Sequence, residues 1–148
     1  MSVLHATTLA RRVDGEWRGV LVRGHSGVGK SDLALRAWER GWRLVADDRT
    51  LVWMSAGLVY GRAPDPIIGL IEARGVGLVA IPALPFVRLA LVVDAAEGSV
   101  ERMPEPERVC VLQADLPRLR FDLFEASTLI KIGLMLEGHA ALGDDGRL

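Results

Sequence analysis

The sequence has few of the features that direct a chain to a membrane, to nucleic acid or to an oxidising compartment. Its 18 basic and 19 acidic residues leave a formal net charge of −1, so its overall charge favours neither nucleic acid nor an anionic membrane. The longest apolar runs are too short for a spanning helix or are interrupted by proline. At the N-terminus, Arg11 and Arg12 follow the apolar stretch, which reverses the order of a secretory signal. These absences predict a cytoplasmic location, with no nucleic acid and no membrane among the partners.

Cysteine is nearly absent as well. Cys110 is the single cysteine, which excludes an internal disulfide. Its apolar surroundings in RVCVL predict a small, buried strand residue. No internal repeat or low-complexity segment occurs, and 148 residues suit one domain. We therefore expect residues 1–148 to form a single domain.

The chain does contain a succession of short apolar runs separated by glycine and proline, which predicts many strands. The predicted strands are 19–24, 42–48, 76–81, 87–95 and 108–113, with a hairpin formed by 50–54 and 58–61. Helices are predicted at 30–41, where Gly41 supplies the stop, and at 122–140, where Asp122 and Glu125 fit a capping box. The middle of the chain lacks enough crossover helices for a purely parallel sheet. We expect an α/β fold, a strand-rich mixed sheet with a phosphate-binding loop and flanking helices.

One segment has a specific chemical pattern. Residues 24–31, GHSGVGKS, match the phosphate-binding pattern G-x-x-x-x-G-K-[ST] at every fixed position, between a predicted strand and a predicted helix. Its three glycines allow a tight turn whose backbone N–H groups point at phosphate oxygens. The positive end of the following helix adds to the attraction for an anion. The segment therefore predicts a P-loop.

The last two residues of the pattern supply side-chain chemistry. The Lys30 ammonium can bridge the β- and γ-phosphates of a nucleotide, and the Ser31 hydroxyl can ligate Mg²⁺. His25 occupies a variable position, so its side chain is expected to be exposed and without a specific role. The predicted nucleotide-binding residues are Gly24, His25, Ser26, Gly27, Val28, Gly29, Lys30 and Ser31.

Two adjacent carboxylates, Asp47 and Asp48, end the predicted strand 42–48. A strand reached from the P-loop helix by a right-handed crossover runs parallel to the strand before the loop, and its carboxyl end opens on the same edge. One carboxylate can then hold Mg²⁺ directly or through water, while the other accepts a proton from an incoming hydroxyl. The sequence does not distinguish which aspartate has which role.

The order of these motifs resembles the catalytic domain of HPr kinase/phosphorylase. The similarity covers about residues 3–95. It is most specific in the P-loop followed at once by LVADD, in GRAP (61–64) and in IEARGVGL (71–78). The resemblance implies a serine kinase that uses ATP and Mg²⁺ to phosphorylate HPr, the phosphocarrier of the sugar phosphotransferase system. Many members of that family also dephosphorylate HPr by phosphorolysis.

The resemblance also implies roles for three further residues. Glu72 would lie on the metal side of the site, together with Ser31 and the aspartate pair, and Arg74 would lie near the transferring phosphate. His5 stands where the family has a histidine early in the domain, although alanine follows it here and glycine follows it there. Beside the aspartates, His5 would tune their proton affinity. From the residues alone, Glu72 and Arg74 fit a surface ion pair equally well.

Three departures separate this sequence from the longer members. The chain begins at the catalytic part, as expected for a short form without the N-terminal regulatory domain. The arginine-bearing PGRN loop of the longer members is replaced by a segment in which Arg118 and Arg120 carry the positive charge, which puts phosphorolysis in doubt. The C-terminal helix aligns weakly, so a homo-oligomer, a hexamer in the family, is expected from the resemblance alone.

Two other functions stay open at this point. A small-molecule kinase, or a relative of the much longer phosphoenolpyruvate carboxykinases, would keep the fold and change the acceptor. A nucleotide-sensing P-loop regulatory module would bind the nucleotide without transferring its phosphate. The presence of Lys30, Ser31 and both aspartates favours chemistry over sensing alone.

Overall fold

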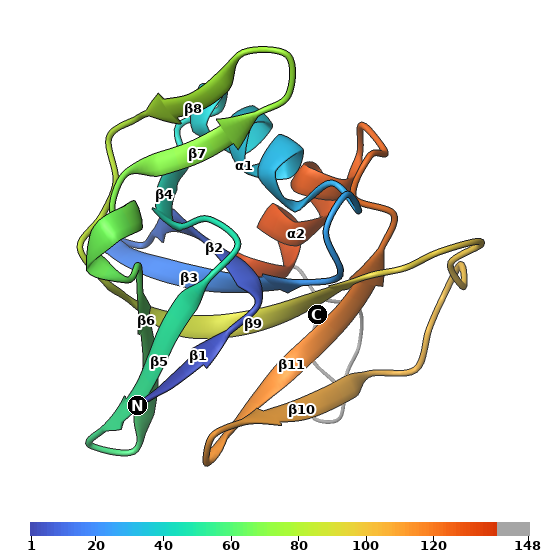
Figure 1. Cartoon of the computed structure of the whole chain (residues 1–148). Helices are drawn as coiled ribbons and strands as arrows, with labels where there is room; N and C mark the ends of the chain where they lie inside the picture. Colours follow the sequence, from blue (N-terminus) through green and yellow to red (C-terminus); the bar gives the residue numbers. More distant parts are fainter. Residues whose placement is uncertain (139–148) are drawn as a thin grey trace.

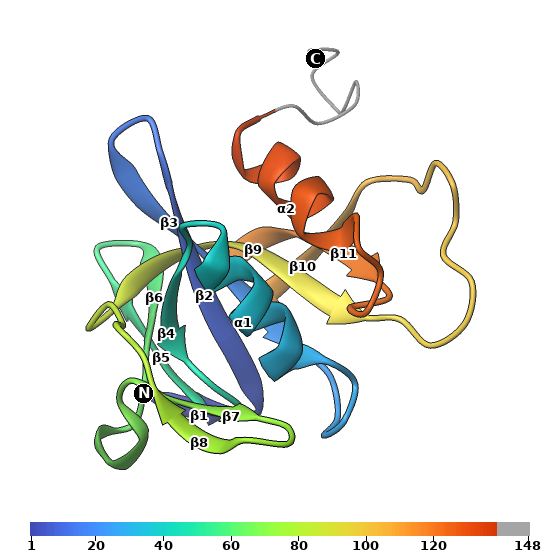
Figure 2. The same cartoon turned by 90° about the horizontal axis from the view of Figure 1, so that it is seen from above.

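The structure is a computed structural model that describes residues 1–138. It contains a nine-stranded mixed sheet with two helices, α1 (Lys30–Glu39) and α2 (Thr128–Leu136), on one face (Figure 1, Figure 2). This confirms the predicted α/β fold with a strand-rich mixed sheet. The strands of the sheet are β1 (Ser2–Leu4), β2 (Ala6–Val13), β3 (Glu16–Arg23), β4 (Arg43–Ala46), β5 (Thr50–Ser55), β6 (Leu58–Arg62), β9 (Val87–Ala95), β10 (Glu107–Val111) and β11 (Ala114–Phe121).

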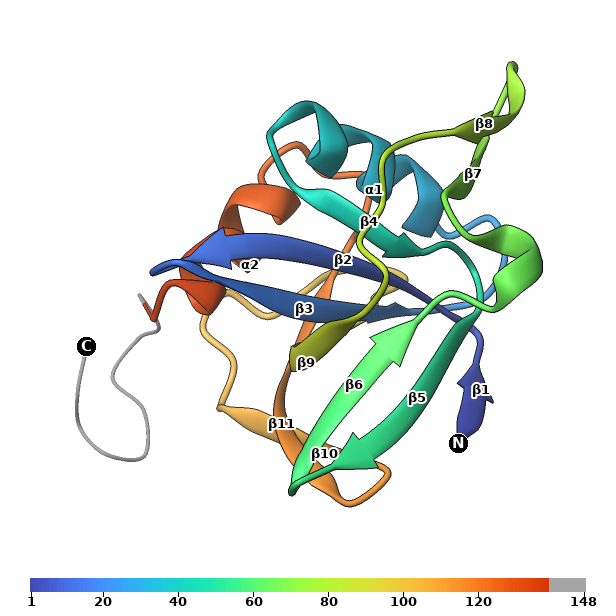
Figure 3. The ribbon, with the colours of Figure 1, turned by 90° about the vertical axis from the view of Figure 1, so that its left-hand side faces the viewer.

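A separate two-stranded hairpin, β7 (Leu70–Ala73) and β8 (Gly77–Ala80), lies beside α1 and projects from the sheet (Figure 3). It is preceded by a short 3-10 helix, η1 (Asp65–Ile67), inside the proline-containing segment predicted as a loop. The sequence indicated only the second strand of this hairpin, although both strands are four residues long. Among residues 1–138, no helix combines the length and apolarity needed to cross a membrane.

The order of the strands brings the ends of β3 and β4 to one edge. The main path of the sheet is β1-β5-β6-β9-β3-β2-β4, and the β10–β11 hairpin joins it through β9. Strand β2 pairs antiparallel with both β3 and β4, so β3 and β4 run in the same direction with β2 between them. Helix α1 connects them, as predicted for the crossover. The sequence prediction did not include β2, the strand that separates the two.

The central strands are buried on both faces. In β3, Val20 and Val22 pack in the core cluster that contains the helices, while Leu21 packs in a second cluster on the other side of the sheet. This alternation is the period of two expected for a strand. On the helix side the core is completed by Leu33, Ala34 and Ala37 of α1 and by Leu129, Ile132 and Leu136 of α2. The P-loop helix is therefore fixed firmly against the sheet.

The first predicted helix is observed with its stop, since Gly41 has a φ of 90° directly after α1. The start predicted for the second helix is wrong. Residues 122–127 form turns, and the Asp122 carboxylate accepts a hydrogen bond from the Phe124 backbone N at 2.9 Å. Such a local aspartate turn competes with a helix start, and α2 begins only at Thr128. The last two residues of the predicted helix, 139–140, lie outside the described residues.

The predicted burial of Cys110 is also wrong, because its side chain is exposed. Strand β10 pairs with β11 at the border of the sheet, and its Val109 and Val111 pack toward the second core cluster. Cys110 lies between them and therefore points the other way. The sequence prediction missed β11, so it did not indicate that this strand belongs to an outlying hairpin.

Candidate functional site

Glycine allows the loop between β3 and α1 to fold tightly. Gly27 and Gly29 have φ values of 86° and 105°, in the left-handed region where residues with a side chain are strained. At Gly24, a Cβ atom would lie 2.8 Å from Val28 Cγ1 and 2.9 Å from Ala95 Cβ. The loop backbone can therefore pack against Ala95, at the end of β9, only because position 24 lacks a side chain.

Lys30 begins α1, but its side chain turns back toward the loop. It is only 6% exposed. Its ammonium donates to the carbonyl oxygen of Gly24 and lies 3.7 Å from Oδ1 of Asp48. The first backbone N–H groups of α1 point into the same region and add a partial positive charge. The turn and the helix thus concentrate positive charge at one point.

Asp47 is the buried carboxylate of the site, with 7% of its surface exposed. It accepts hydrogen bonds from Ser31 Oγ at 2.8 and 3.0 Å and from Thr7 Oγ1 at 3.0 Å. It also accepts one from the Glu72 backbone N at 3.1 Å. These donors come from α1, β2 and β7, so three elements fix the orientation of the carboxylate. A hydroxyl beside a carboxylate is a pair of oxygens suited to Mg²⁺.

Asp48 has a different environment from its neighbour. Its φ of 67° places it in the left-handed conformation, which aspartate tolerates better than most residues but at some cost in energy. Its backbone N donates to Thr7 Oγ1 at 3.0 Å. The side chain is 56% exposed and faces Lys30. The change of backbone direction therefore buries one aspartate and leaves the other open to solvent.

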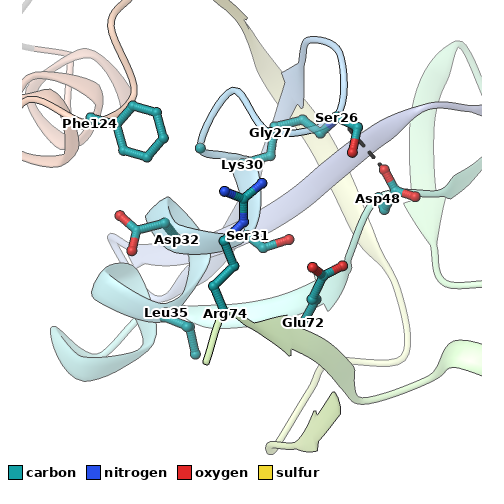
Figure 4. Close-up of a pocket in the computed structure, with 11 residues that line it drawn as sticks. Ser26, Gly27, Lys30, Ser31, Asp32, Leu35, Asp48, Glu72, Arg74 and Phe124 are labelled. Atoms are coloured by element: carbon teal, nitrogen blue, oxygen red, sulfur yellow. Dashed lines mark ion pairs between the residues drawn. The ribbon is translucent and has the colours of Figure 1, made fainter. Parts of the chain in front are cut away.

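The β7–β8 hairpin contributes a carboxylate and a cation to the same place (Figure 4). The Glu72 side chain is exposed toward the pocket, and Arg74 Nη2 lies 3.3 Å from the position that a Cβ of Gly27 would take. Arg74 thus lies over the P-loop. The two side chains do not form the surface ion pair with each other that the sequence left open; both line one pocket, together with Ser26, Gly27, Gly29, Lys30, Ser31, Asp32, Leu35, Asp48 and Phe124.

This set of residues fits a metal-bound polyphosphate. The glycine turn, Lys30 and Arg74 present positive groups, while Ser31, Asp47 and Glu72 present oxygens. Within residues 1–138, no three histidine, cysteine or acidic side chains are grouped so as to hold a metal by themselves. Mg²⁺ commonly uses one or two carboxylates and completes its shell with water and phosphate oxygens. The donors present therefore suit Mg²⁺ that arrives with a nucleotide.

Neither of the two histidines of the predicted site is among the described residues that line the pocket. His25 is exposed, as expected, but its Nε2 hydrogen-bonds Glu97, and this bond raises the pKa of His25. His5 is exposed at the bend between β1 and β2 and is not among the residues that line the pocket. Its role in tuning the aspartates stays a prediction.

A cluster of charged side chains lies at the end of β3, directly before the P-loop. Arg23, the last residue of β3, donates to Asp94 at 2.7 and 2.9 Å, and Arg118 of β11 donates to the same carboxylate. Burial acts to raise the pKa of Asp94, but the hydrogen bonds from Arg23 and Arg118 outweigh it and lower this pKa. Arg118 and Arg120 also pair with Glu107. Both arginines are thus engaged by carboxylates, away from the pocket lining.

The sequence model of the family described as HPr Serine kinase C-terminal domain matches residues 10–86. This segment contains the P-loop, the aspartate pair and the β7–β8 hairpin. The chain belongs to this family.

Two curated relatives are both named HPr kinase/phosphorylase. The protein of Geobacillus thermodenitrificans is 40% identical over 68% of this chain and 37% of its own length. The protein of Variovorax paradoxus is 40% identical over 58% of this chain and 31% of its own length. The chain therefore spans about a third of the length of these relatives.

A solved structure gives the comparison for the fold. It is described as the Hpr(Ser) kinase/phosphatase from Coxiella burnetii and matches with a TM-score of 0.78, covering 94% of this chain and 90% of that chain. At 22% sequence identity the likeness shows a shared fold. The mixed sheet with its few helices is thus the fold of this family.

Two residues of the site were missed by sequence reasoning. Thr7, fully buried, links Asp47 to the backbone of Asp48, but it lies in β2, a strand that was not predicted. Phe124 lies in the pocket lining, but the sequence placed it inside a helix. Half of the residues of β2 (ATTLARRV) are polar, so nothing in the sequence distinguished Thr7. Nothing in the sequence distinguished Phe124 either.

Proposed function

We propose that this chain is an ATP- and Mg²⁺-dependent serine kinase whose acceptor is an HPr-like phosphocarrier protein of the sugar phosphotransferase system. The observation that carries the proposal is the convergence of Lys30, Ser31 and Asp48 in one pocket beside a glycine turn, with the buried Asp47 hydrogen-bonded to Ser31. Family membership and the printed names of the relatives support the choice of acceptor. Mg²⁺, when bound with ATP, supplies charge neutralisation at the phosphates.

The different environments of the two aspartates suggest their roles. Asp47 is buried and bonded to Ser31, so it would orient the metal-side oxygens. Asp48 is exposed in the pocket beside Lys30, so it can meet an incoming hydroxyl and accept its proton. The serine oxygen would then form a bond to the γ-phosphorus while the bond from that phosphorus to the β–γ bridging oxygen breaks. The products are phosphoserine and ADP, with the proton on Asp48.

The two cations of the pocket would stabilise the transferring group. The Lys30 ammonium lies 3.7 Å from Asp48 Oδ1, so it would contact a γ-phosphate bound beside Asp48. Arg74 lies beside Gly27 and lines the same pocket. Positive groups positioned before the reaction stabilise charge on the moving phosphoryl group without reorganisation.

Phosphorolysis, the reverse activity that the names of the relatives include, stays a prediction. It requires a group that holds inorganic phosphate near the phosphoserine. Arg118 and Arg120, the candidates that the sequence offered, pair with Asp94 and Glu107. Neither is among the described residues that line the pocket.

The test is transfer of the γ-phosphoryl of labelled ATP to the serine of an HPr-like carrier in the presence of Mg²⁺. We expect label on the carrier serine and none on a carrier with that serine replaced by alanine. Lys30→Ala should lower the transfer rate by at least about 100-fold, since it removes a positioned positive charge.

Lys131→Ala is the matched control for this variant, because it removes the chain's other lysine, which is exposed on α2. We expect it to keep the wild-type rate. A Lys30→Ala protein that folds and retains most of its activity would overturn the proposed role of the P-loop. Label on small metabolites, or binding of ATP without transfer, would overturn the proposed acceptor.

A further inference from the structure

An aromatic ring lies in the pocket on the side of the P-loop opposite Asp48 (Figure 4). Phe124 is 60% exposed, and its ring lines the pocket together with Leu35 and the loop glycines Gly27 and Gly29. The ring also packs on the loop: a Cβ at Gly29 would lie 3.1 Å from Phe124 Cζ. One side of the ring is thus supported by the P-loop, while much of its surface faces solvent.

The position of Phe124 is fixed by the turn that the sequence missed. Asp122 Oδ1 accepts a hydrogen bond from the Phe124 backbone N at 2.9 Å. Arg36 of α1 donates to the carbonyl oxygen of Leu123 and, at 3.3 Å, to that of Glu125. The Leu123 side chain is buried in the core beside these contacts. The turn is therefore attached to the P-loop helix, and the ring is held next to the start of that helix.

The direction of a bound nucleotide follows from the charged groups. In a P-loop, the lysine contacts the β- and γ-phosphates and the loop backbone holds the α- and β-phosphates. Lys30 and Asp48 therefore mark the γ end. The α-phosphate and the nucleoside must leave at the other end, where the pocket lining consists of Asp32, Leu35 and Phe124.

We propose that Phe124 is the surface on which the base of the nucleotide stacks, an inference that rests on the nucleotide-binding function proposed above. A flat base covers an exposed aromatic ring and gains both apolar burial and stacking. Every base has such a face, so stacking alone does not select one base. The ring therefore strengthens binding of nucleotides in general, and ATP and GTP should depend on it to a similar extent.

The experiment compares a ligand with a base to one without it. Calorimetric dissociation constants are measured for ATP, GTP and inorganic tripolyphosphate, each with Mg²⁺, on wild type and on Phe124→Ala. We expect Phe124→Ala to weaken ATP and GTP by about tenfold, the effect typical of losing one stacked base. Tripolyphosphate affinity should change by less than about twofold, because it has no base to stack.

Two further variants make the result specific. Phe124→Trp keeps a stacking surface and should keep wild-type affinity for ATP. Phe86→Ala removes an equally exposed phenylalanine, 54% exposed, from the aromatic cluster with Trp53 and Tyr60, and should change nothing. Unchanged ATP affinity in Phe124→Ala, or equal losses for ATP and tripolyphosphate, would overturn the inference. Wild type that binds neither ligand would overturn the nucleotide-binding function itself, and the inference with it.

Discussion

The two adjacent aspartates, Asp47 and Asp48, have different environments. Asp47 is buried and accepts four hydrogen bonds, two of them from Ser31 to its two oxygens, whereas Asp48 is exposed beside Lys30. The left-handed backbone of Asp48 produces this difference. The electrostatic repulsion between the two carboxylates is reduced because Asp47 accepts hydrogen bonds and Asp48 lies beside the Lys30 ammonium.

This difference predicts opposite effects of the two isosteric substitutions. Asp48→Asn removes the proton acceptor, so the transfer rate should fall by at least about 100-fold. Its affinity for ATP with Mg²⁺ should stay the same or increase, because Lys30 loses its ion-pair partner and becomes free for phosphate. Asp47→Asn should instead weaken the Mg²⁺-dependent part of ATP binding.

Binding by calorimetry and transfer by labelling, measured on both variants, separate these roles. If Asp48→Asn transfers phosphate at the wild-type rate while Asp47→Asn does not, the assignment of the base is reversed. If both variants transfer normally, neither aspartate accepts the proton.

At the scale of elements, the site depends on three parallel strands, β3, β9 and β11, whose side chains form ion pairs next to the P-loop. Arg23 of β3, Asp94 of β9 and Arg118 of β11 form one connected set of ion pairs, and Arg23 is the residue directly before the P-loop. The strand register places Arg23 opposite Asp94. This cluster therefore fixes the end of β3 from which the loop begins.

The lowered pKa of Asp94 predicts how this cluster contributes to stability at different pH. Because the pKa is lower in the folded state, the contribution is complete above the unfolded value, about 3.9. It is lost as the pH falls through the folded value. At neutral pH, Asp94→Asn should lower the free energy of unfolding by about 2 kcal/mol, since it weakens hydrogen bonds to two charged groups.

Denaturant unfolding between neutral and acidic pH measures this difference. The gap between wild type and Asp94→Asn should shrink as the solution is acidified. Asp115→Asn is the control, because it removes an exposed partner of Arg108 on the neighbouring hairpin and should cost less than about 1 kcal/mol. A gap that stays constant with pH would contradict the role of the Asp94 charge.

The sequence predicted the elements that have strong local patterns. The strand before GHSGVGKS, the helix after it with the stop at Gly41 and the strand leading to Asp47 are all observed. The prediction from sequence failed where the formation of an element depends on its neighbours in the fold. Strands β2 and β11 have many polar residues, and they form because they pair with neighbouring strands. The start of α2 was missed because the Asp122 side chain accepts a hydrogen bond from the Phe124 backbone N and forms a turn there. The capping-box pattern is compatible with such a turn as well as with a helix start.

At the scale of the whole molecule, the site lies at one edge of the mixed sheet, between the P-loop, the Asp47–Asp48 turn and the β7–β8 hairpin (Figure 1, Figure 4). The motif residues predicted to meet do lie together, because the crossover through α1 makes β3 and β4 parallel. The buried hydroxyl of Thr7 and the ring of Phe124 could not be predicted, since each comes from a segment distant in sequence. The homo-oligomer inferred from the resemblance stays a prediction.

The most direct test of the account is a crystal structure of this chain with Mg²⁺ and a non-hydrolysable ATP analogue. We predict that the γ-phosphate lies between Lys30 and Asp48, with the metal beside Ser31 and Asp47. A nucleotide bound elsewhere on the molecule, or one whose γ-phosphate points away from Lys30 and the aspartates, would contradict it.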